Sequence, residues 1–388
     1  MYNILTLNKI AKCGIDQLNP ETYTITDDAA FNAEGIILRS YSMHDMELGD
    51  KLLAVARAGA GTNNIPIDKC SEKGIVVFNT PGANANAVKE LVFAGMLLAS
   101  RDITGGIEWA CALSGDDVAK QVEKGKSSFA GCELQGKTLG VIGLGAIGIL
   151  VANTARHFGM NVIGYDPYLS VDAAWRLSSH INKAKSIDEV YADSDYISIH
   201  VPFTPDTKHM INKDTIAKMK DGVKLLNFAR GELVNNDDIK AAIADGKVSC
   251  YVVDFPSAET VNQKGIIAIP HLGASTAESE DNCAMMAAQE LAAYLETGDI
   301  LNSVNFPNCS LSTSNGGRIC IMHANAPSMI NKFTQVLADD GLNITDMINK
   351  SKKDNAYTII NTDIAITDEI AKEVSEIEGV IRVRVINA

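Results

Sequence analysis

Arg230, Glu259 and His271 carry the side chains that acid–base chemistry on a hydroxyl group requires. Histidine accepts a proton near physiological pH, a nearby carboxylate orients the ring, and the planar guanidinium of arginine can grip a carboxylate through two oxygens. Hydride removal from a 2-hydroxy acid needs these groups beside a bound hydride acceptor. On the residues alone, His200 competes with His271 for the role of base, and Glu232 competes with Glu259 for the role of carboxylate.

A glycine-rich turn lies between two strand-like runs in residues 137–166. The first run, 138–142, is apolar and β-branched, as a buried parallel strand must be, and Gly143, Gly145 and Gly148 follow it in G-x-G-x-x-G spacing. The first glycine permits a tight turn, the second lets the backbone approach a pyrophosphate, and the third lets the next helix pack close to its strand. This spacing predicts a dinucleotide-binding turn.

The residues that follow the turn indicate which dinucleotide binds. A helix predicted over about 147–158 would direct its free N–H groups and the positive end of its dipole at the phosphates. Asp166 ends the second run, where its carboxylate would accept both hydroxyls of an adenosine ribose and repel a 2′-phosphate. The sequence therefore favours NAD over NADP.

Composition excludes several other classes of protein. A chain of 388 residues should form two or three domains, and a net charge of −14 argues against nucleic acid or an anionic membrane as the main partner. The first residues do not have the pattern of a signal peptide, and no apolar run approaches the ~20 residues that span a bilayer, so we expect a cytoplasmic protein. The eight cysteines are scattered without a C-x-x-C pair, which predicts reduced thiols and no metal site.

The first hundred residues alternate short apolar runs with helical stretches, which predicts a doubly wound α/β unit. Ligands of such sheets bind beyond the carboxyl ends of the strands. The runs 35–38 and 52–56 are followed by Arg39 and Arg57, so an anionic ligand with carboxylate or phosphate groups is expected at this edge. A surface position for either arginine is the alternative.

The region after the glycine turn continues as a second parallel α/β unit. Its later strands are predicted at 196–201, 223–227, 250–253 and 266–269. Each ends in a residue with chemical capability, and these residues are, in order, His200, Arg230, Asp254 and His271.

The last seventy or so residues follow the order βαββαβ, which is typical of a ferredoxin-like unit. The predicted fold class is thus α/β, with two doubly wound parallel-sheet (Rossmann-like) domains and a C-terminal ferredoxin-like domain. The predicted boundaries are a discontinuous flavodoxin-like substrate domain (1–95 and 284–306), an NAD-binding domain (96–283), a polar linker (307–317) and the C-terminal domain (318–388).

Four segments (139–166, 227–234, 254–259 and 270–276) together resemble the D-isomer-specific 2-hydroxyacid dehydrogenases, and the likeness extends over essentially the whole chain. The resemblance implies that Arg230 binds and activates the substrate, that Glu259 orients His271, and that His271 is the acid/base. It also implies a cofactor site made of Gly143, Gly145, Ala146, Ile147, Gly148, Asp166, His200, Pro202, Thr207, Phe228, Ala229, Asp254 and Gly273. The positions implied to hold the substrate's carboxylate and phosphate are Arg39, Ser40, Arg57, Gly59, Asn84 and Lys89.

The chain departs from the family pattern at three places. The stretch after Glu259 is shortened to residues 260–263, Lys89 stands where a small residue is frequent, and Ala146 replaces a frequent basic residue. The last two departures bear on phosphate or cofactor affinity.

The C-terminal unit resembles an ACT domain, which in this family binds serine and inhibits the enzyme. His323, Asn325 and Asn343 match its effector positions, while Ser328 stands in place of a glycine. The added side chain and the lost freedom at positive φ bear on the turn that presents the effector site.

The implied activity is NAD-dependent oxidation of 3-phospho-D-glycerate to 3-phosphooxypyruvate, the first step of phosphorylated L-serine biosynthesis, regulated by serine. One alternative is a hydroxypyruvate, glyoxylate or 2-oxoglutarate reductase of the same family. Another, from a different class, is an NADH-sensing binding protein. A homodimer through the nucleotide-binding domains, or a homotetramer, is expected.

Overall fold

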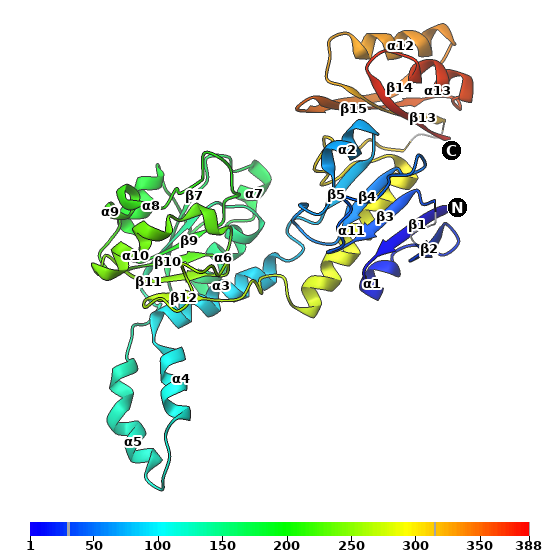
Figure 1. Cartoon of the computed structure of the whole chain (residues 1–388). Helices are drawn as coiled ribbons and strands as arrows, with labels where there is room; N and C mark the ends of the chain where they lie inside the picture. Colours follow the sequence, from blue (N-terminus) through cyan, green and yellow to red (C-terminus); the bar gives the residue numbers. More distant parts are fainter. Residues whose placement is uncertain (29–31, 314–315, 388) are drawn as a thin grey trace. The chain divides into compact units, whose positions relative to one another are not determined.

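The structure, a computed structural model, describes residues 1–28, 32–313 and 316–387 and divides into two compact units (Figure 1). Unit 1 comprises Met1–Asn84 and Ala277–Ala388, and unit 2 comprises Ala85–Thr276. None of the described helices has both the length and the apolar composition that crossing a bilayer requires.

Unit 1 begins with a five-stranded parallel sheet. In order of pairing, its strands are β2 (Tyr23–Thr26), β1 (Tyr2–Leu7), β3 (Gly35–Leu38), β4 (Ala54–Arg57) and β5 (Val76–Asn79). The helices of this part are α1 (Lys12–Ile15), α2 (Ile67–Glu72) and the long α11 (Ala277–Thr297). Helix α11 packs on the sheet through an apolar face that includes the fully buried Leu291 and Leu295.

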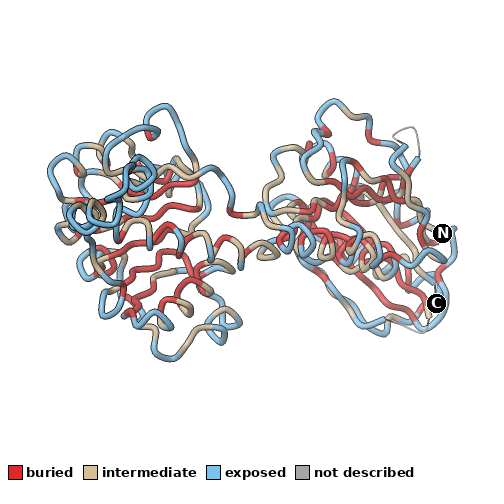
Figure 2. Tube along the Cα trace, turned by 90° about the horizontal axis from the view of Figure 1, so that it is seen from below, coloured by how far each residue is buried: buried red, intermediate tan, exposed pale blue. Residues whose placement is uncertain are grey.

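Unit 2 is built on a seven-stranded parallel sheet. In order of pairing, its strands are β12 (Ile266–Ala268), β11 (Val248–Val253), β10 (Val223–Asn227), β9 (Tyr196–Ile199), β6 (Thr138–Ile142), β7 (Asn161–Tyr165) and β8 (Asn182–Lys183). Its helices are α3 (Ala85–Ser100), α6 (Ala146–His157), α7 (Val171–Trp175), α8 (Ile187–Asp193), α9 (Lys213–Ala217), η2 (Gly231–Leu233) and α10 (Asn236–Ala244). Figure 2 shows that the buried residues of this unit follow the strands, as expected of a sheet covered on both faces.

Unit 2 also contains an element that the sequence did not predict, a helical hairpin over residues 103–129. It consists of α4 (Ile103–Cys111), α5 (Val118–Gly125) and the short η1 (Lys126–Phe129), and it projects from the rest of unit 2 (Figure 1). Both α4 and α5 are fully described, and neither contains a buried residue. We refer to residues 103–129 as the hairpin.

The C-terminal part of unit 1 is a four-stranded antiparallel sheet. Its strands pair in the order β14 (Ile344–Lys352), β15 (Asn355–Thr362), β13 (Gly317–Ala324) and β16 (Val380–Asn387), and its helices are α12 (Met329–Asp339) and α13 (Asp368–Ser375). This is the predicted βαββαβ order, and the predicted fold class is confirmed. One face of the sheet packs against the two helices, whereas the other joins the apolar core that contains α11.

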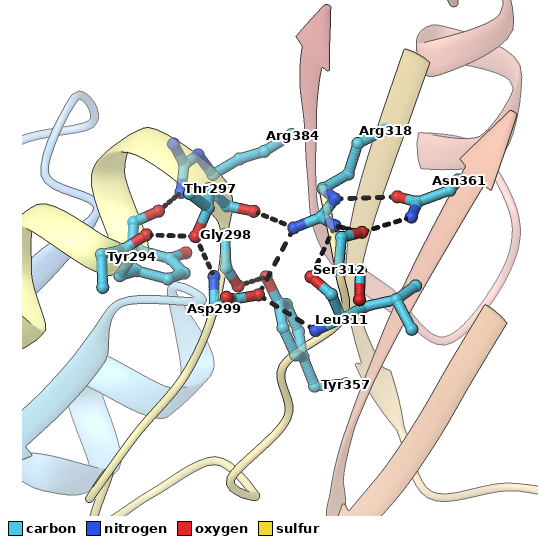
Figure 3. A network of polar contacts seen from close by, with 11 residues as sticks. Tyr294, Thr297, Gly298, Asp299, Leu311, Ser312, Arg318, Tyr357, Asn361 and Arg384 are labelled. Carbon is cyan, nitrogen blue, oxygen red and sulfur yellow. Dashed lines mark hydrogen bonds and ion pairs between the residues drawn. The ribbon is translucent and has the colours of Figure 1, made fainter. Parts of the chain in front are cut away.

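Arginine side chains fasten this sheet to the rest of unit 1 (Figure 3). Arg318 is 3% exposed and donates to the carbonyl oxygens of Thr297, Leu311 and Ser312 and to Asn361 Oδ1, and it pairs with Asp299 at 3.3 Å. Arg384 donates to the carbonyl oxygens of Tyr294 and Leu295 at the end of α11. We refer to this contact, made by Arg318, Tyr357 and Arg384 with residues 294–299, as the junction.

The segment predicted as a linker, 307–317, is ordered where it is described. Cys309 is 1% exposed and exchanges backbone hydrogen bonds with Ile300, and Leu311 and Ser312 accept from Arg318. Residues 314–315 of the predicted linker lie outside the described residues.

Candidate active site

The glycine turn after β6 has the geometry that its spacing predicts. Gly143 has φ 90°, and a Cβ there would lie 2.7 Å from the carbonyl oxygen of His200. A Cβ on Gly148 would collide with the carbonyl oxygen of Gly143. Both positions therefore require glycine, the first for its backbone conformation and the second for close packing of α6 on the strand.

Gly145 differs from its two neighbours because nothing lies within 4 Å of a Cβ built on it. It caps α6, whose first N–H groups have no partner within the helix and carry the positive end of its dipole. Open space, unpaired donors and positive potential at one point suit a pyrophosphate. Ala146 and Ile147, the next predicted cofactor residues, form the first turn of this helix.

Asp166 follows β7 and faces the same turn. Its Oδ2 accepts from the Leu144 N–H at 2.9 Å, and its Oδ1 accepts from the Tyr168 N–H at 2.8 Å. These bonds fix the carboxylate beside the glycine turn, and each oxygen keeps a lone pair for a ribose hydroxyl. The charge of Asp166 disfavours a 2′-phosphate there.

His200 lies behind this turn and is a weak candidate for the base. Its Nε2 is 2.8 Å from Ser198 Oγ, and burial lowers its pKa to about 4. The other predicted cofactor residues follow β9 and β10. Thr207 donates to the Pro202 carbonyl at 2.8 Å, Phe228 is buried, and the Ala229 N–H donates to Asn227 Oδ1 at 3.2 Å.

Asp254 ends β11 as a buried carboxyl group with spare hydrogen-bonding capacity. It is 1% exposed, and its Oδ1 has no hydrogen-bond partner among the described residues. Burial raises its pKa to about 7, against the opposing charge of Arg230. Its Oδ2 lies 3.7 Å from the position of a Cβ built on Gly273, so the backbone of Gly273 lies beside this carboxyl group. An orphaned buried carboxyl fits the amide of a nicotinamide ring.

Arg230 and His271 are brought near each other through Phe255. The rings of Phe255 and His271 are 4.5 Å apart, and Arg230 Cζ lies 5.7 Å from the centre of the Phe255 ring. Partial burial, together with the charge of Arg230, lowers the pKa of His271. The imidazole is therefore held neutral, which is the form that accepts a proton.

Glu259 is hydrogen-bonded to a residue that the sequence did not single out. Its Oε2 accepts from Asn236 Nδ2 at 2.6 Å, and the described residues include no hydrogen bond between Glu259 and His271. The turn that carries Glu259 is closed by Ser257 and Thr260, whose Oγ1 accepts from the Ser257 N–H at 2.8 Å. The orienting role of Glu259 stays a prediction.

Unit 1 places its two predicted substrate arginines at neighbouring strand ends. Leu38 of β3 pairs with Arg57 of β4, so Arg39 and Arg57 share the carboxyl edge. Arg57 Nε donates to the Arg39 carbonyl at 3.1 Å, and burial lowers the pKa of its guanidinium. Gly59 has φ 153°, a conformation that strains other residues, and a Cβ there would lie 2.6 Å from Arg57 Nη1.

The remaining substrate predictions are divided between the units. The Ser40 N–H donates to Asn8 Oδ1 at 3.1 Å, and Asn84 lies in the loop after β5, both in unit 1. Lys89 lies in α3 of unit 2 and pairs with Glu90 at 3.6 Å. Arg39 pairs with Glu280 of α11 at 2.8 Å, a partner that sequence reasoning missed because it is 241 positions away.

Within one chain, Asn343 lies at the opposite end of the sheet from the other two predicted effector residues, His323 and Asn325. Both ring nitrogens of His323 are engaged, by the Ala324 carbonyl and by Thr358 Oγ1, and the side chain is 2% exposed overall. Asn325 donates to the Lys353 carbonyl at one end of the β14–β15 hairpin, whereas the Asn343 N–H donates to Asp363 at the other. Ser328 adopts φ 67°, so it keeps the left-handed conformation that a glycine would take.

Comparison with known proteins defines the class. Residues 96–275 match the family described as D-isomer specific 2-hydroxyacid dehydrogenase, NAD binding domain. A D-3-phosphoglycerate dehydrogenase from Haemophilus influenzae is 31% identical over 368 residues, which cover 91% of this chain and 86% of that protein. The chain belongs to the D-isomer specific 2-hydroxyacid dehydrogenases and is an NAD-dependent dehydrogenase, as the sequence resemblance predicted.

Two solved structures share its fold. A 3-phosphoglycerate dehydrogenase from Entamoeba histolytica with bound NAD+ is 26% identical, with a TM-score of 0.60 over 78% of this chain and 98% of that one. A glyoxylate reductase from Paecilomyes thermophila is 25% identical, with a TM-score of 0.63 and the same coverage of the two chains.

Proposed function

We propose that the protein catalyses NAD-dependent oxidation of 3-phospho-D-glycerate to 3-phosphooxypyruvate, the first step of phosphorylated L-serine biosynthesis. The placement of Arg39 and Arg57 at adjacent strand ends carries this proposal. A substrate with both a carboxylate and a phosphate needs more cationic partners than a simple hydroxy acid. The similarity to D-3-phosphoglycerate dehydrogenases supports the same substrate.

In this reaction the hydroxyl proton passes to His271 Nε2 or Nδ1, and the carbon that bears the hydroxyl becomes a carbonyl. When bound, NAD would supply the hydride acceptor for that carbon. Arg230 grips the substrate carboxylate and polarises the reacting oxygen, and Asp254 would hold the carboxamide of a bound nicotinamide. Since Glu259 is bound to Asn236 through Oε2, its Oε1 is available to orient His271.

The test is NADH consumption with 3-phosphooxypyruvate, hydroxypyruvate and 2-oxoglutarate, with the wild type and His271→Ala side by side. We expect a preference for the phosphorylated acid, and a loss of roughly 10²–10⁴-fold in kcat in the variant, the usual contribution of a general acid/base. His180→Ala removes an exposed histidine of unit 2 and serves as the control. Arg57→Ala should raise KM for the phosphorylated acid more than for hydroxypyruvate.

A glyoxylate or hydroxypyruvate reductase is the second candidate, favoured by the similarity to a glyoxylate reductase. Equal or better turnover of an unphosphorylated acid, with KM unaffected by Arg57→Ala, would establish it. Tight NADH binding without turnover of any hydroxy acid would instead favour an NADH-sensing binding protein.

We further propose that L-serine binds the C-terminal domain through His323, Asn325 and Asn343. Because Asn325 and Asn343 lie at opposite ends of one β-hairpin, a site that uses all three needs a second copy of the domain. Calorimetry with L-serine on the wild type and on Asn325→Ala tests this proposal. If L-serine releases no heat of binding and leaves the rate of the enzyme unchanged, the C-terminal domain does not bind serine as an effector.

The same proposal includes a homo-oligomer formed through unit 2, and a cytoplasmic location. Ile107 on the hairpin is 59% exposed and Ile103 is 38% exposed. Exposed apolar side chains on helices without any buried residue support a covering partner, and a second copy is the simplest one.

A further inference from the structure

An open surface cavity of about 660 Å³ lies in unit 1, and neither Arg39 nor any predicted effector residue lines it. It is formed by the turn after β5, by the segment that follows α11, and by the end of β14. Its walls include Asn79, Pro81, Asn302, Ser303, Lys350 and Lys352. The volume suits a small metabolite.

The cavity is positively charged, whereas the whole chain carries a net negative charge. Lys350 and Lys352 supply two cations, and none of the described lining residues is a carboxylate, although the protein carries a net charge of −14. Lys350 is exposed and makes no ion pair among the described residues. Ser351 and Asn308 add a hydroxyl and an amide.

The walls are held in place before any ligand binds. Lys352 Nζ donates to the Ser303 carbonyl at 2.7 Å, and Asn355 Nδ2 donates to the Asn305 carbonyl at 3.1 Å. These two bonds hold strands β14 and β15 against the segment after α11. Asn79 Nδ2 donates to the Ala60 carbonyl at 2.6 Å, which fixes the opposite wall. A pre-formed site loses little free energy to ordering when a ligand binds.

The ammonium group of Lys352 keeps two N–H donors after its bond to Ser303. Burial, together with the neighbouring charge of Lys353, lowers the pKa of Lys352. A bound anion would relieve this unfavourable environment by supplying the opposite charge.

We propose that this cavity, between the β14–β15 hairpin and the turn after β5, is a second anion-binding site that takes a small hydrophilic metabolite bearing a carboxylate or a phosphate. Lys350 and Lys352 contact its oxyanion, and Ser351 and Asn308 hydrogen-bond to its polar groups. Asn79 is the strand partner of Arg57, so the cavity lies beside the Arg39 and Arg57 edge, but neither arginine lines it.

Titration calorimetry with inorganic phosphate tests the proposal on the full-length protein. All titrations are made with saturating NADH, which occupies the pyrophosphate site at the glycine turn. Arg57→Ala weakens phosphate binding at the substrate edge, so the binding that persists in this variant reports on the second site. We expect Arg57→Ala to retain one phosphate per chain, and Arg57→Ala with Lys350→Glu to bind it at least about tenfold more weakly. A tenfold change corresponds to about 1.4 kcal/mol.

Arg57→Ala with Lys332→Glu is the matched control, because Lys332 is an exposed lysine of the same domain that does not line the cavity. It carries the same change in charge and should bind phosphate as Arg57→Ala does. Malonate in the same titrations separates a carboxylate ligand from a phosphate ligand. Binding of neither anion to Arg57→Ala, or equal weakening by Lys350→Glu and Lys332→Glu, would overturn the proposal.

Discussion

The junction and the hairpin are two helix-containing regions that meet their surroundings in opposite ways. At the junction, Arg318 uses its guanidinium N–H groups on partners from three segments of the chain, and Tyr357 donates to the Gly298 carbonyl at 2.6 Å. In the hairpin, Trp109 and Phe129 pack on each other with ring centres 5.2 Å apart, yet α4 and α5 contain no buried residue.

The polar groups of the junction find their partners within the chain, whereas the apolar side chains of the hairpin do not. Because the hydrogen-bonding groups of the junction are paired within the chain, substitutions there should lower the free energy of unfolding. The hairpin keeps exposed apolar side chains, so changes there should be felt in association.

The largest effect is expected from Arg318→Leu. This substitution leaves the carbonyl oxygens of Thr297 and Leu311 without their side-chain donor and Asp299 without its cation. Removing one partner of a buried charge network typically costs about 3–5 kcal/mol. Urea unfolding should show this loss, whereas Lys372→Ala, at an exposed position of α13, should change stability by less than about 0.5 kcal/mol. Equal effects would contradict a saturated junction.

Two glycines allow a matched comparison of packing. Gly298 at the junction and Gly115 in the hairpin have φ 76° and φ 95°, so replacing either with alanine strains the backbone by about 1–2 kcal/mol. Only at Gly298 would the new Cβ collide with Cys320 Sγ, while at Gly115 the sole contact is Asp117 Oδ1 at 3.6 Å. Gly298→Ala should therefore cost about 1–3 kcal/mol more, as measured by thermal or urea unfolding. A smaller difference would mean that the junction can relax.

A third effect depends on pH. Glu290 of α11 is 5% exposed, accepts from Asn302 Nδ2 at 2.6 Å, and has its pKa raised to about 8 by burial. The folded state then binds a proton that the unfolded state releases, so this group lowers stability as pH rises from its ordinary pKa of 4.5 to about 8, with no further loss above that.

Glu290→Gln keeps the acceptor for Asn302 and removes the titration. Relative to the wild type, the variant should gain about 2 kcal/mol of stability between pH 6 and pH 8, since each pH unit contributes about 1.4 kcal/mol. Glu108→Gln, on an exposed face of the hairpin, should show no such trend. If both differences stay flat with pH, Glu290 ionises at its ordinary pKa.

The smallest effect on stability is expected from Ile107→Ser in the hairpin. Because Ile107 is 59% exposed, the free energy of unfolding of the isolated chain should change by less than about 0.5 kcal/mol. Sedimentation velocity should instead show weaker self-association, with Val171→Ser, 73% exposed and outside the hairpin, as the control. Unchanged association in both variants would show that the hairpin does not form the interface between copies.

Sequence reasoning recovered the elements whose signal is local. The runs before Gly143 and Arg57 are short and apolar and end in turn residues, so strand and turn were both predictable. The hairpin was missed because its polar and apolar residues are mixed and none of them is buried within the chain. The predicted linker around Cys309 proved ordered because its partners, Ile300 and Arg318, supply contacts that composition does not reveal.

The candidate active site likewise has features that the sequence predicted and features that it did not. The spacing of three glycines and the position of Asp166 at the end of a strand were sufficient to predict the NAD turn. The pairing of Glu259 with Asn236, and of Arg39 with Glu280, was not predictable because a loop and a long helix bring these residues together only after folding.

Apart from the hairpin, the sequence by itself determined the order of the main strands and helices, the glycine turn and the side chains available at each strand end, because these depend on covalent spacing and backbone sterics. Tertiary structure alone decided which carboxyl groups lose their solvent, and so raised the pKa of Asp254 to about 7 and of Glu290 to about 8. It also decided which carbonyl oxygens Arg318 satisfies. Desolvation and long-range hydrogen bonding arise only when distant segments exclude water together.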